Sequence, residues 1–206
     1  MRIGRETARY ALPHRAAGGE RPRGRQARPS AKEPRERVKT SLTVDCRVTG
    51  LESALLVTLR NVTEEDLPIF FEHQRDAVAL HMAAFASRER DAFLTHWRTK
   101  VLRPGNVTRA IVVGGLVAGY IGSWEQDGKR LVAYWIGREH WGQGIATRAL
   151  CQFLLLERVR PLHAWVAVHN VGSIRVLEKC GFRTVAQETP QHPDGVPEVL
   201  LALGST

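Results

Sequence analysis

Residues 134–147 read YWIGREHWGQGIAT, and this stretch decides the fold. A predicted strand that ends at Ile136 leads into the turn, and an amphipathic helix predicted over 145–156 leaves it. Gly142 and Gly144 stand between the two, where glycine lets the backbone curl and approach a ligand closely. The first amides of a helix are unpaired and point outward, so the turn predicts a site for an anion such as a pyrophosphate.

Two common phosphate-binding motifs do not fit this turn. A P-loop needs lysine and a hydroxyl residue after its last glycine, but Ile145 and Ala146 follow Gly144. A dinucleotide fingerprint needs a third glycine where this chain has Thr147, and it normally follows the first strand of a parallel sheet. For the two glycines taken alone, a tight structural turn without a ligand remains the alternative.

The sequence around the turn predicts one mixed α/β (α+β) domain. Gly114-Gly115 and Asp127-Gly128 are typical hairpin turns, so the strands around them form an antiparallel meander. The first helix is expected to begin with Thr63 as its N-cap. Strands are predicted at 55–60, 110–113, 116–124, 131–136, 163–168, 183–188 and 198–203, and helices at 63–75, 88–102, 145–156 and 172–180.

Two segments resemble the signatures of the GNAT superfamily of acyltransferases. WGQGIA at 141–146 resembles its acetyl-CoA loop, usually Gln/Arg-x-x-Gly-x-Gly/Ala, and NVGSIRVLEKCGF at 170–182 resembles its second signature, which ends in Lys-x-Gly-Phe. The resemblance covers about residues 55–203 and implies a mixed, mostly antiparallel central sheet flanked by helices. Trp141 stands where Gln or Arg is usual, which is similar to the branch containing ribosomal-protein N-terminal (alanine) acetyltransferases.

The resemblance implies an N-acetyltransferase that moves an acetyl group directly from acetyl-CoA to a primary amine. The acceptor would be a protein N-terminus or a small-molecule amine. The thioester would lie in a splay between the strands at 131–136 and 163–168. The implied contacts to acetyl-CoA are Tyr134, Trp135, Ile136, Trp141, Gly142, Gln143, Gly144, Ile145, Ala146, Thr147, Asn170 and Ser173.

The catalytic residues are less clearly marked than the cofactor loop. The family often carries a tyrosine seven residues after the asparagine, as the general acid for the leaving thiolate, but this chain has Leu177. Ser173 is therefore our candidate hydrogen-bond donor, and Glu125, at the end of the third β run, is our candidate base. A solvated turn carboxylate is the alternative for Glu125. No cluster of His, Asp or Glu suggests a metal.

The acceptor, by the same resemblance, lies between the first helical region and the late β-hairpin. Candidate wall residues are Phe71, Phe85, Phe93 and Trp97, although helical core packing explains each equally well. The loop at 189–195 is expected to form a lid or a simple turn, and Cys180 is expected to pack rather than react.

Charge is spread unevenly along the chain of 206 residues, whose formal net charge is +9. Residues 1–50 hold 13 Lys and Arg against 5 Asp and Glu, whereas residues 51–206 hold 17 against 16. The first segment has no apolar period, so we predict a disordered Arg/Pro-rich arm at 1–50 and an N-acetyltransferase domain at 51–206. The arm is open to three interpretations: a ribosome or RNA tether, a transit peptide, or a solvated extension.

A protein that binds the ribosome or nucleic acid and merely retains the fold is the alternative function. No stretch approaches the roughly 20 apolar residues of a membrane span, so no membrane partner is expected. Cys46, Cys151 and Cys180 lie far apart with neither zinc spacing nor a disulfide framework. We therefore expect a cytoplasmic transferase that is a monomer or a homodimer.

Overall fold

A computed structural model describes residues 56–188 and 196–204 of the chain. In order, these residues form β1 Val57–Arg60, α1 Asp66–Arg75, α2 Ala77–Ala83, α3 Arg90–His96 with the π-helical turn Trp97–Val101, β2 Val107–Val113, β3 Leu116–Gln126, β4 Lys129–Ile136, the 3-10 turn Arg138–His140, α4 Ile145–Leu156, β5 Leu162–Ala167, α5 Val171–Lys179, β6 Arg183–Glu188 and β7 Glu198–Leu203. Every predicted strand and helix is confirmed, and α2 is an element that the sequence analysis missed.

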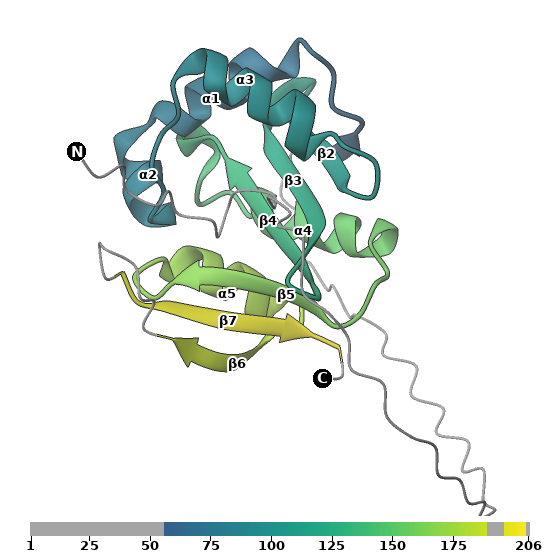
Figure 1. Cartoon of the computed structure of the whole chain (residues 1–206), viewed down its shortest axis with the longest axis vertical. Helices are drawn as coiled ribbons and strands as arrows, with labels where there is room; N and C mark the ends of the chain where they lie inside the picture. Colours follow the sequence, from purple (N-terminus) through teal and green to yellow (C-terminus); the bar gives the residue numbers. More distant parts are fainter. Residues whose placement is uncertain (1–55, 189–195, 205–206) are drawn as a thin grey trace, which may run out of the picture.

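The strands form one sheet in the order β1-β2-β3-β4-β5-β7-β6 (Figure 1). All neighbours are antiparallel except β4 and β5. These two parallel strands pair only at Arg130–Leu162 and Leu131–His163. Beyond Leu131 they share no ladder, which confirms the predicted splay. We call the paired part the closed end of β4 and β5, and the part toward Ile136 the open end.

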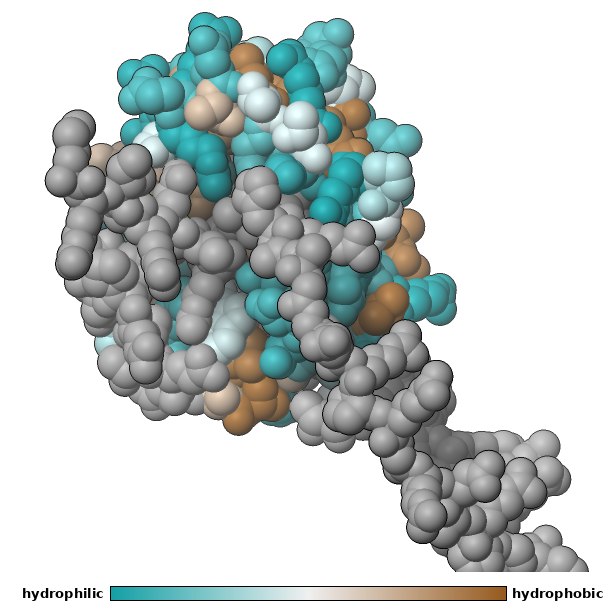
Figure 2. Space-filling model, in the orientation of Figure 1, coloured by the Kyte–Doolittle hydropathy of each residue, from teal (hydrophilic) through white to brown (hydrophobic). Residues whose placement is uncertain are grey.

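Helices cover both faces of the sheet, because β3 and β4 alternate apolar side chains between two cores. Ile121, Val132 and Ile136 belong to the larger core, with buried residues of α4 and α5. Tyr120 packs against the smaller core of α1, α3 and β2. In Figure 1, α1, α2 and α3 lie together above β3 and β4, while β5, β7, β6 and α5 lie below. The visible surface over α1 and α3 is mainly hydrophilic (Figure 2).

The predicted N-cap of the first helix is wrong. The helix begins at Asp66 with Glu65 as its N-cap residue, and no side chain caps it. The Thr63 amide instead donates to Asp66 Oδ2 at 2.8 Å, and the Arg60 guanidinium pairs with the same carboxylate at 2.6 Å. In place of the expected hydroxyl cap, the buried Asp66 carboxylate thus binds the Thr63 amide and the exposed Arg60 guanidinium at the start of the helix.

A buried polar cluster holds the closed end of β4 and β5. The Arg130 guanidinium lies 2.7 Å from Glu157 Oε2, just after α4, and Ser123 Oγ on β3 donates to the same carboxylate. These hydrogen bonds and the Val159 amide lower the pKa of Glu157, although its burial opposes the shift. The cluster joins β3, β4 and the end of α4 at the point from which the two parallel strands diverge.

The two described cysteines, Cys151 and Cys180, differ in burial. Cys180 is fully buried in the larger core and is a free thiol, and burial raises its pKa to about 11. Packing, the role expected for it, is confirmed, because a thiol with that pKa is protonated at neutral pH. Cys151 is half-buried, and its Sγ lies 3.6 Å from Cys180 Sγ.

Candidate active site

A cavity of about 420 Å³, which we call the loop cavity, lies at the open end of β4. Its wall is formed by the end of β4, the turn at 141–147, the start of α4 and one side of α5. Every predicted acetyl-CoA contact except Gln143 lies on this wall. The exposed side chain of Gln143 instead donates to the carbonyl of Glu139 at 3.0 Å.

The turn at the loop cavity depends on its glycines. Gly142 and Gly144 have φ angles of +75° and +71°, a region that other residues adopt only with strain. Gly144 is the N-cap residue of α4, and no side chain caps the helix. The first amides of α4 are therefore available to a ligand, as the sequence predicted.

Trp141 has a structural role that accounts for its place in the motif. Its indole Nε1 donates to the carbonyl of Ile136 at 2.9 Å. This hydrogen bond ties the turn to the last residue of β4. A tryptophan thus satisfies a backbone carbonyl at the open end of the sheet, at the position where the family usually has Gln or Arg.

Two basic residues of the loop cavity were missed by the sequence analysis. Arg175 and Lys179 lie four residues apart on α5, are exposed, and line the cavity. Within the described ranges, neither forms an ion pair. Their spacing on one helix face, close after Asn170, is a signal that could have identified them. Together with the α4 amides, they give the cavity a positive potential suited to phosphates.

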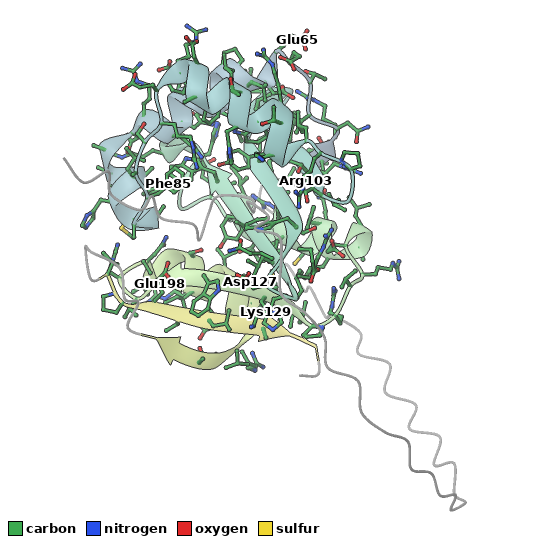
Figure 3. All side chains as sticks on the ribbon, in the orientation of Figure 1. Glu65, Phe85, Arg103, Asp127, Lys129 and Glu198 are labelled. Atoms are coloured by element: carbon green, nitrogen blue, oxygen red, sulfur yellow. The ribbon has the colours of Figure 1, made fainter. Side chains whose placement is uncertain are left out.

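A second cavity, of about 130 Å³, lies beside the loop cavity and is rich in aromatic rings. We call it the aromatic cavity. Phe85, Phe93 and Trp97, which the sequence suggested as wall residues, line it, and Phe93 and Trp97 also pack in the smaller core; Phe71 packs in that core without lining the cavity. Phe85 lies between α2 and α3 (Figure 3). The other rings of the wall are Tyr120, Trp124, Trp135 and Trp165.

The two cavities share part of their walls. Ala83, Trp135, Asn170 and Ser173 line both of them. A ligand in the loop cavity can therefore meet a ligand in the aromatic cavity at these residues, without crossing the sheet. Trp135 faces both cavities, whereas Tyr134 lines only the loop cavity and packs partly against the larger core.

Ser173 is held at this junction by hydrogen bonds to Asn170 and Tyr134, whose hydroxyl also donates to the Ser173 carbonyl at 3.3 Å. The Ser173 amide donates to Asn170 Oδ1 at 3.1 Å, which makes Asn170 the N-cap of α5. Ser173 Oγ lies 2.8 Å from the Tyr134 hydroxyl. Burial raises the pKa of Tyr134, so its phenol stays protonated at neutral pH. Leu177, at the place of the family tyrosine, is 1% exposed and packs in the larger core.

The structure does not bring Glu125 to this junction. Glu125 pairs with Arg130 beside the turn that carries Asp127 and Lys129 (Figure 3), at the closed end of β4 and β5. It is exposed and lines neither cavity. Strand alternation places it on the same face of β3 as Ile121, which packs with α4 residues in the larger core. Because of this position, Glu125 is not the base in the mechanism proposed below.

Glu198 is a buried carboxylate that the sequence analysis overlooked. It is 7% exposed and starts β7, where it pairs with Ala167 of β5. Ala167 lines the aromatic cavity, and directly paired residues of neighbouring strands share a face of the sheet. Glu198 therefore borders the aromatic cavity, on the opposite face of the sheet from Glu125. Figure 3 shows it at the start of β7, below Phe85.

Metal chemistry and membrane insertion find no support in the part of the chain that the structure describes. No group of three or more His, Cys, Asp or Glu in that part could hold a metal ion. Among the same residues, no helix is long and apolar enough to cross a bilayer.

Comparison with known protein families agrees with this geometry. The family model of the acetyltransferase (GNAT) domain matches residues 57–183, which is more than half of the chain. The chain belongs to the GNAT acetyltransferase family. The match contains both signatures, the splayed strands and the whole loop cavity. None of the curated proteins compared with this acetyltransferase matches it significantly.

Solved structures share the fold of this acetyltransferase. An aminoglycoside acetyltransferase, AAC(6')-Ib, in complex with coenzyme A is 22% identical, with a TM-score of 0.60 over 72% of this chain and 94% of that one. A spermidine N-acetyltransferase from Vibrio cholerae, with CoA and spermine, is 15% identical, with a TM-score of 0.64 over 71% and 94%. A GNAT-family acetyltransferase from Bacillus anthracis is 16% identical, with a TM-score of 0.62 over 73% and 95%.

Proposed function

We propose that this enzyme transfers the acetyl group of acetyl-CoA directly to a primary amine. The observation that carries the proposal is the junction at Ser173, where the loop cavity meets the aromatic cavity. One cavity suits a long polyanionic donor, and the other suits an acceptor of different chemistry. The similar structures that contain coenzyme A support the same assignment of the loop cavity.

Acetyl-CoA fits the residues of the loop cavity. The amides at the start of α4 and the turn at 141–147 suit its pyrophosphate, and Arg175 and Lys179 suit its phosphates as cations. The open end of β4 leaves backbone groups without a ladder partner on β5, and these suit the amides of the pantetheine arm. When bound, acetyl-CoA supplies a thioester whose acetyl carbon is open to attack by an amine.

Ser173 is the proposed donor to the leaving thiolate. In the transfer, the amine nitrogen bonds to the acetyl carbon, the carbon–sulfur bond breaks, and the sulfur gains negative charge. The Tyr134 phenol stays protonated and lies within hydrogen-bond distance of Ser173 Oγ. When Tyr134 donates to Ser173, the serine hydroxyl is free to donate to the sulfur. Tyr134 is thus a positioning residue, and the pair takes the place of the family tyrosine that Leu177 replaces.

Glu198 is the proposed base that takes the proton of the amine. Asp66 and Glu157 are the other buried carboxylates of the described residues, and neither lines the aromatic cavity. Glu198 alone among these three borders the aromatic cavity through its partner Ala167. A base is required because an amine with a pKa of about 8 to 10 is mostly protonated at neutral pH.

The finer assignments stay predictions. The similarity to ribosomal-protein acetyltransferases rests on Trp141, and the nucleic-acid or ribosome interaction rests on the basic arm at 1–50. The arm and the loop at 189–195 both lie outside the described residues. The cytoplasmic location and the oligomeric state are likewise untested.

Two measurements test the proposed function. Calorimetry should detect acetyl-CoA binding, and thiol release should be detected when purified enzyme meets acetyl-CoA and a panel of peptides, aminoglycosides and polyamines. Because each acceptor class is assayed separately, the panel also distinguishes a protein acetyltransferase from a small-molecule one. An absence of acetyl-CoA binding at millimolar concentration would contradict the proposal.

A further inference from the structure

Arg88 is an arginine on the wall of the aromatic cavity without a carboxylate partner in the described structure. Its side chain is half-buried, and its guanidinium carbon lies 5.3 Å from the centre of the Phe85 ring. It makes no ion pair with a described residue. Arg130, by contrast, is paired with the carboxylate of Glu157. A half-buried guanidinium with no counter-ion among the described residues is suited to pair with the acid group of a ligand.

The charge of Arg88 acts within the cavity. His96 and Tyr120 also line the cavity. Burial lowers the pKa of His96 and raises the pKa of Tyr120, and the positive charge of Arg88 adds to the first shift and opposes the second. For His96, burial is the larger cause, and its pKa falls to about 4. His96 is therefore uncharged at neutral pH. Arg88 is then the one formal charge among the described residues that line the aromatic cavity.

No described carboxylate lines this cavity. Glu198 borders it through Ala167 but is not part of its wall. A polycation such as a polyamine needs several carboxylates to replace its hydration, because an uncompensated charge in a site of low dielectric is costly. The wall instead offers flat aromatic surface and one guanidinium, which suits an apolar body with an anionic group.

We propose that the acceptor of this enzyme is an apolar or aromatic amine that also carries a carboxylate, with Arg88 as the residue that recognises this carboxylate. The inference rests on the proposed acetyl transfer and names the class of its acceptor. The aromatic rings pack against the apolar body, and the amine reaches the junction at Ser173 and Asn170. Arg88 forms a charge-assisted pair with the acid group.

Matched acceptor pairs test this assignment. We compare L-phenylalanine with phenethylamine, and 4-(aminomethyl)benzoate with benzylamine, by kcat/KM in the thiol-release assay. The two pairs place the carboxylate at different distances from the amine. Wild type, Arg88→Gln and Arg90→Gln are assayed side by side. Arg90 is the matched control because it is exposed, starts α3, and lies outside the cavity wall.

For at least one pair, the ratio of acid to decarboxylated amine should fall about 10- to 100-fold in Arg88→Gln and stay unchanged in Arg90→Gln. Comparing ratios removes the different basicities of the two amines, because that difference is the same for every enzyme variant. The same ratio in Arg88→Gln and wild type for both pairs would overturn the assignment, as would spermidine being the best acceptor of wild type.

A binding measurement separates this proposal from the proposed function. Calorimetric titration of the two acids into enzyme saturated with CoA reports carboxylate recognition without any chemistry. If the acids bind through Arg88 but no amine releases thiol, acetyl transfer fails and the anion site stands. If thiol is released with other amines while Arg88→Gln changes neither binding nor the ratio, acetyl transfer stands and the anion site fails.

Discussion

The loop cavity and the aromatic cavity meet at Ser173 but are built in different ways. The loop cavity uses backbone amides, two glycines at positive φ and one helix terminus, nearly all from the continuous stretch 134–147 and from α5. The aromatic cavity uses side chains from the α2–α3 region, β3, β4 and β5. A polyanion can be bound by a local backbone shape, whereas an acceptor is recognised by side chains that only the tertiary fold assembles. Most of the predictions below disrupt one cavity and leave the other intact, and one tests the junction that both cavities share.

Gly144→Asp should have the largest effect, on the loop cavity alone. Gly144 has φ +71°, so any side chain there is strained, and a carboxylate would repel the phosphates at the start of α4. We expect acetyl-CoA affinity to fall more than about 100-fold, measured by calorimetry.

Gly128→Asp is the matched control for the strain. Gly128 also has φ +71°, lies in the β3–β4 turn, and has open space where a Cβ would stand. The Gly128→Asp substitution therefore introduces the same backbone strain without adding a charge to the loop cavity. Equal losses of affinity in the two variants would show that strain, rather than the loop cavity, is responsible.

Glu198→Gln should have the next largest effect, on the side of the aromatic cavity. Removing the base should lower kcat/KM for the amine about 100-fold at pH 7, with acetyl-CoA affinity unchanged. The deficit should shrink as the pH rises toward the pKa of the amine, because more of the acceptor is then already deprotonated. Glu125→Gln is the control, since Glu125 is exposed on the α4 face of β3. If Glu125→Gln has the larger defect, the base has been assigned to the wrong carboxylate.

This pair of glutamates shows where prediction from sequence stops. The turn at 141–147 follows from local rules, because glycine spacing and a helix start are written in consecutive residues. The splay of β4 and β5 could be inferred only by resemblance to the family. The position of Glu198 could not be predicted from the sequence. Glu198 lies beside the aromatic cavity because of the register of β7 with β5, and the pairing of these two strands depends on the whole sheet. The role of Arg88 could not be predicted from the sequence either, because it depends on the finding that no described carboxylate lines the aromatic cavity.

Ser173→Ala tests the junction, which belongs to both cavities. It should lower kcat about 10- to 30-fold while acetyl-CoA affinity changes little, because the lost hydrogen bond forms mainly as the thiolate leaves. Alanine keeps the backbone amide that donates to Asn170, so the cap of α5 survives. Tyr134→Phe should give a smaller loss of kcat, because it removes only the support of the Ser173 hydroxyl. An unchanged kcat in Ser173→Ala would exclude this hydroxyl as the donor.

Arg175→Gln and Lys179→Gln should have the smallest effects, each weakening acetyl-CoA binding about 5- to 10-fold. The effects are modest because both side chains are exposed and water screens their charges. Each variant should also reduce the dependence of affinity on salt, since one cation fewer meets the phosphates. Arg158→Gln is the control, because Arg158 is exposed after the far end of α4 and outside the loop cavity. A cavity built mainly from backbone should tolerate either loss, so a defect as severe as that of Gly144→Asp would mean that side-chain cations, rather than α4 amides, dominate phosphate binding.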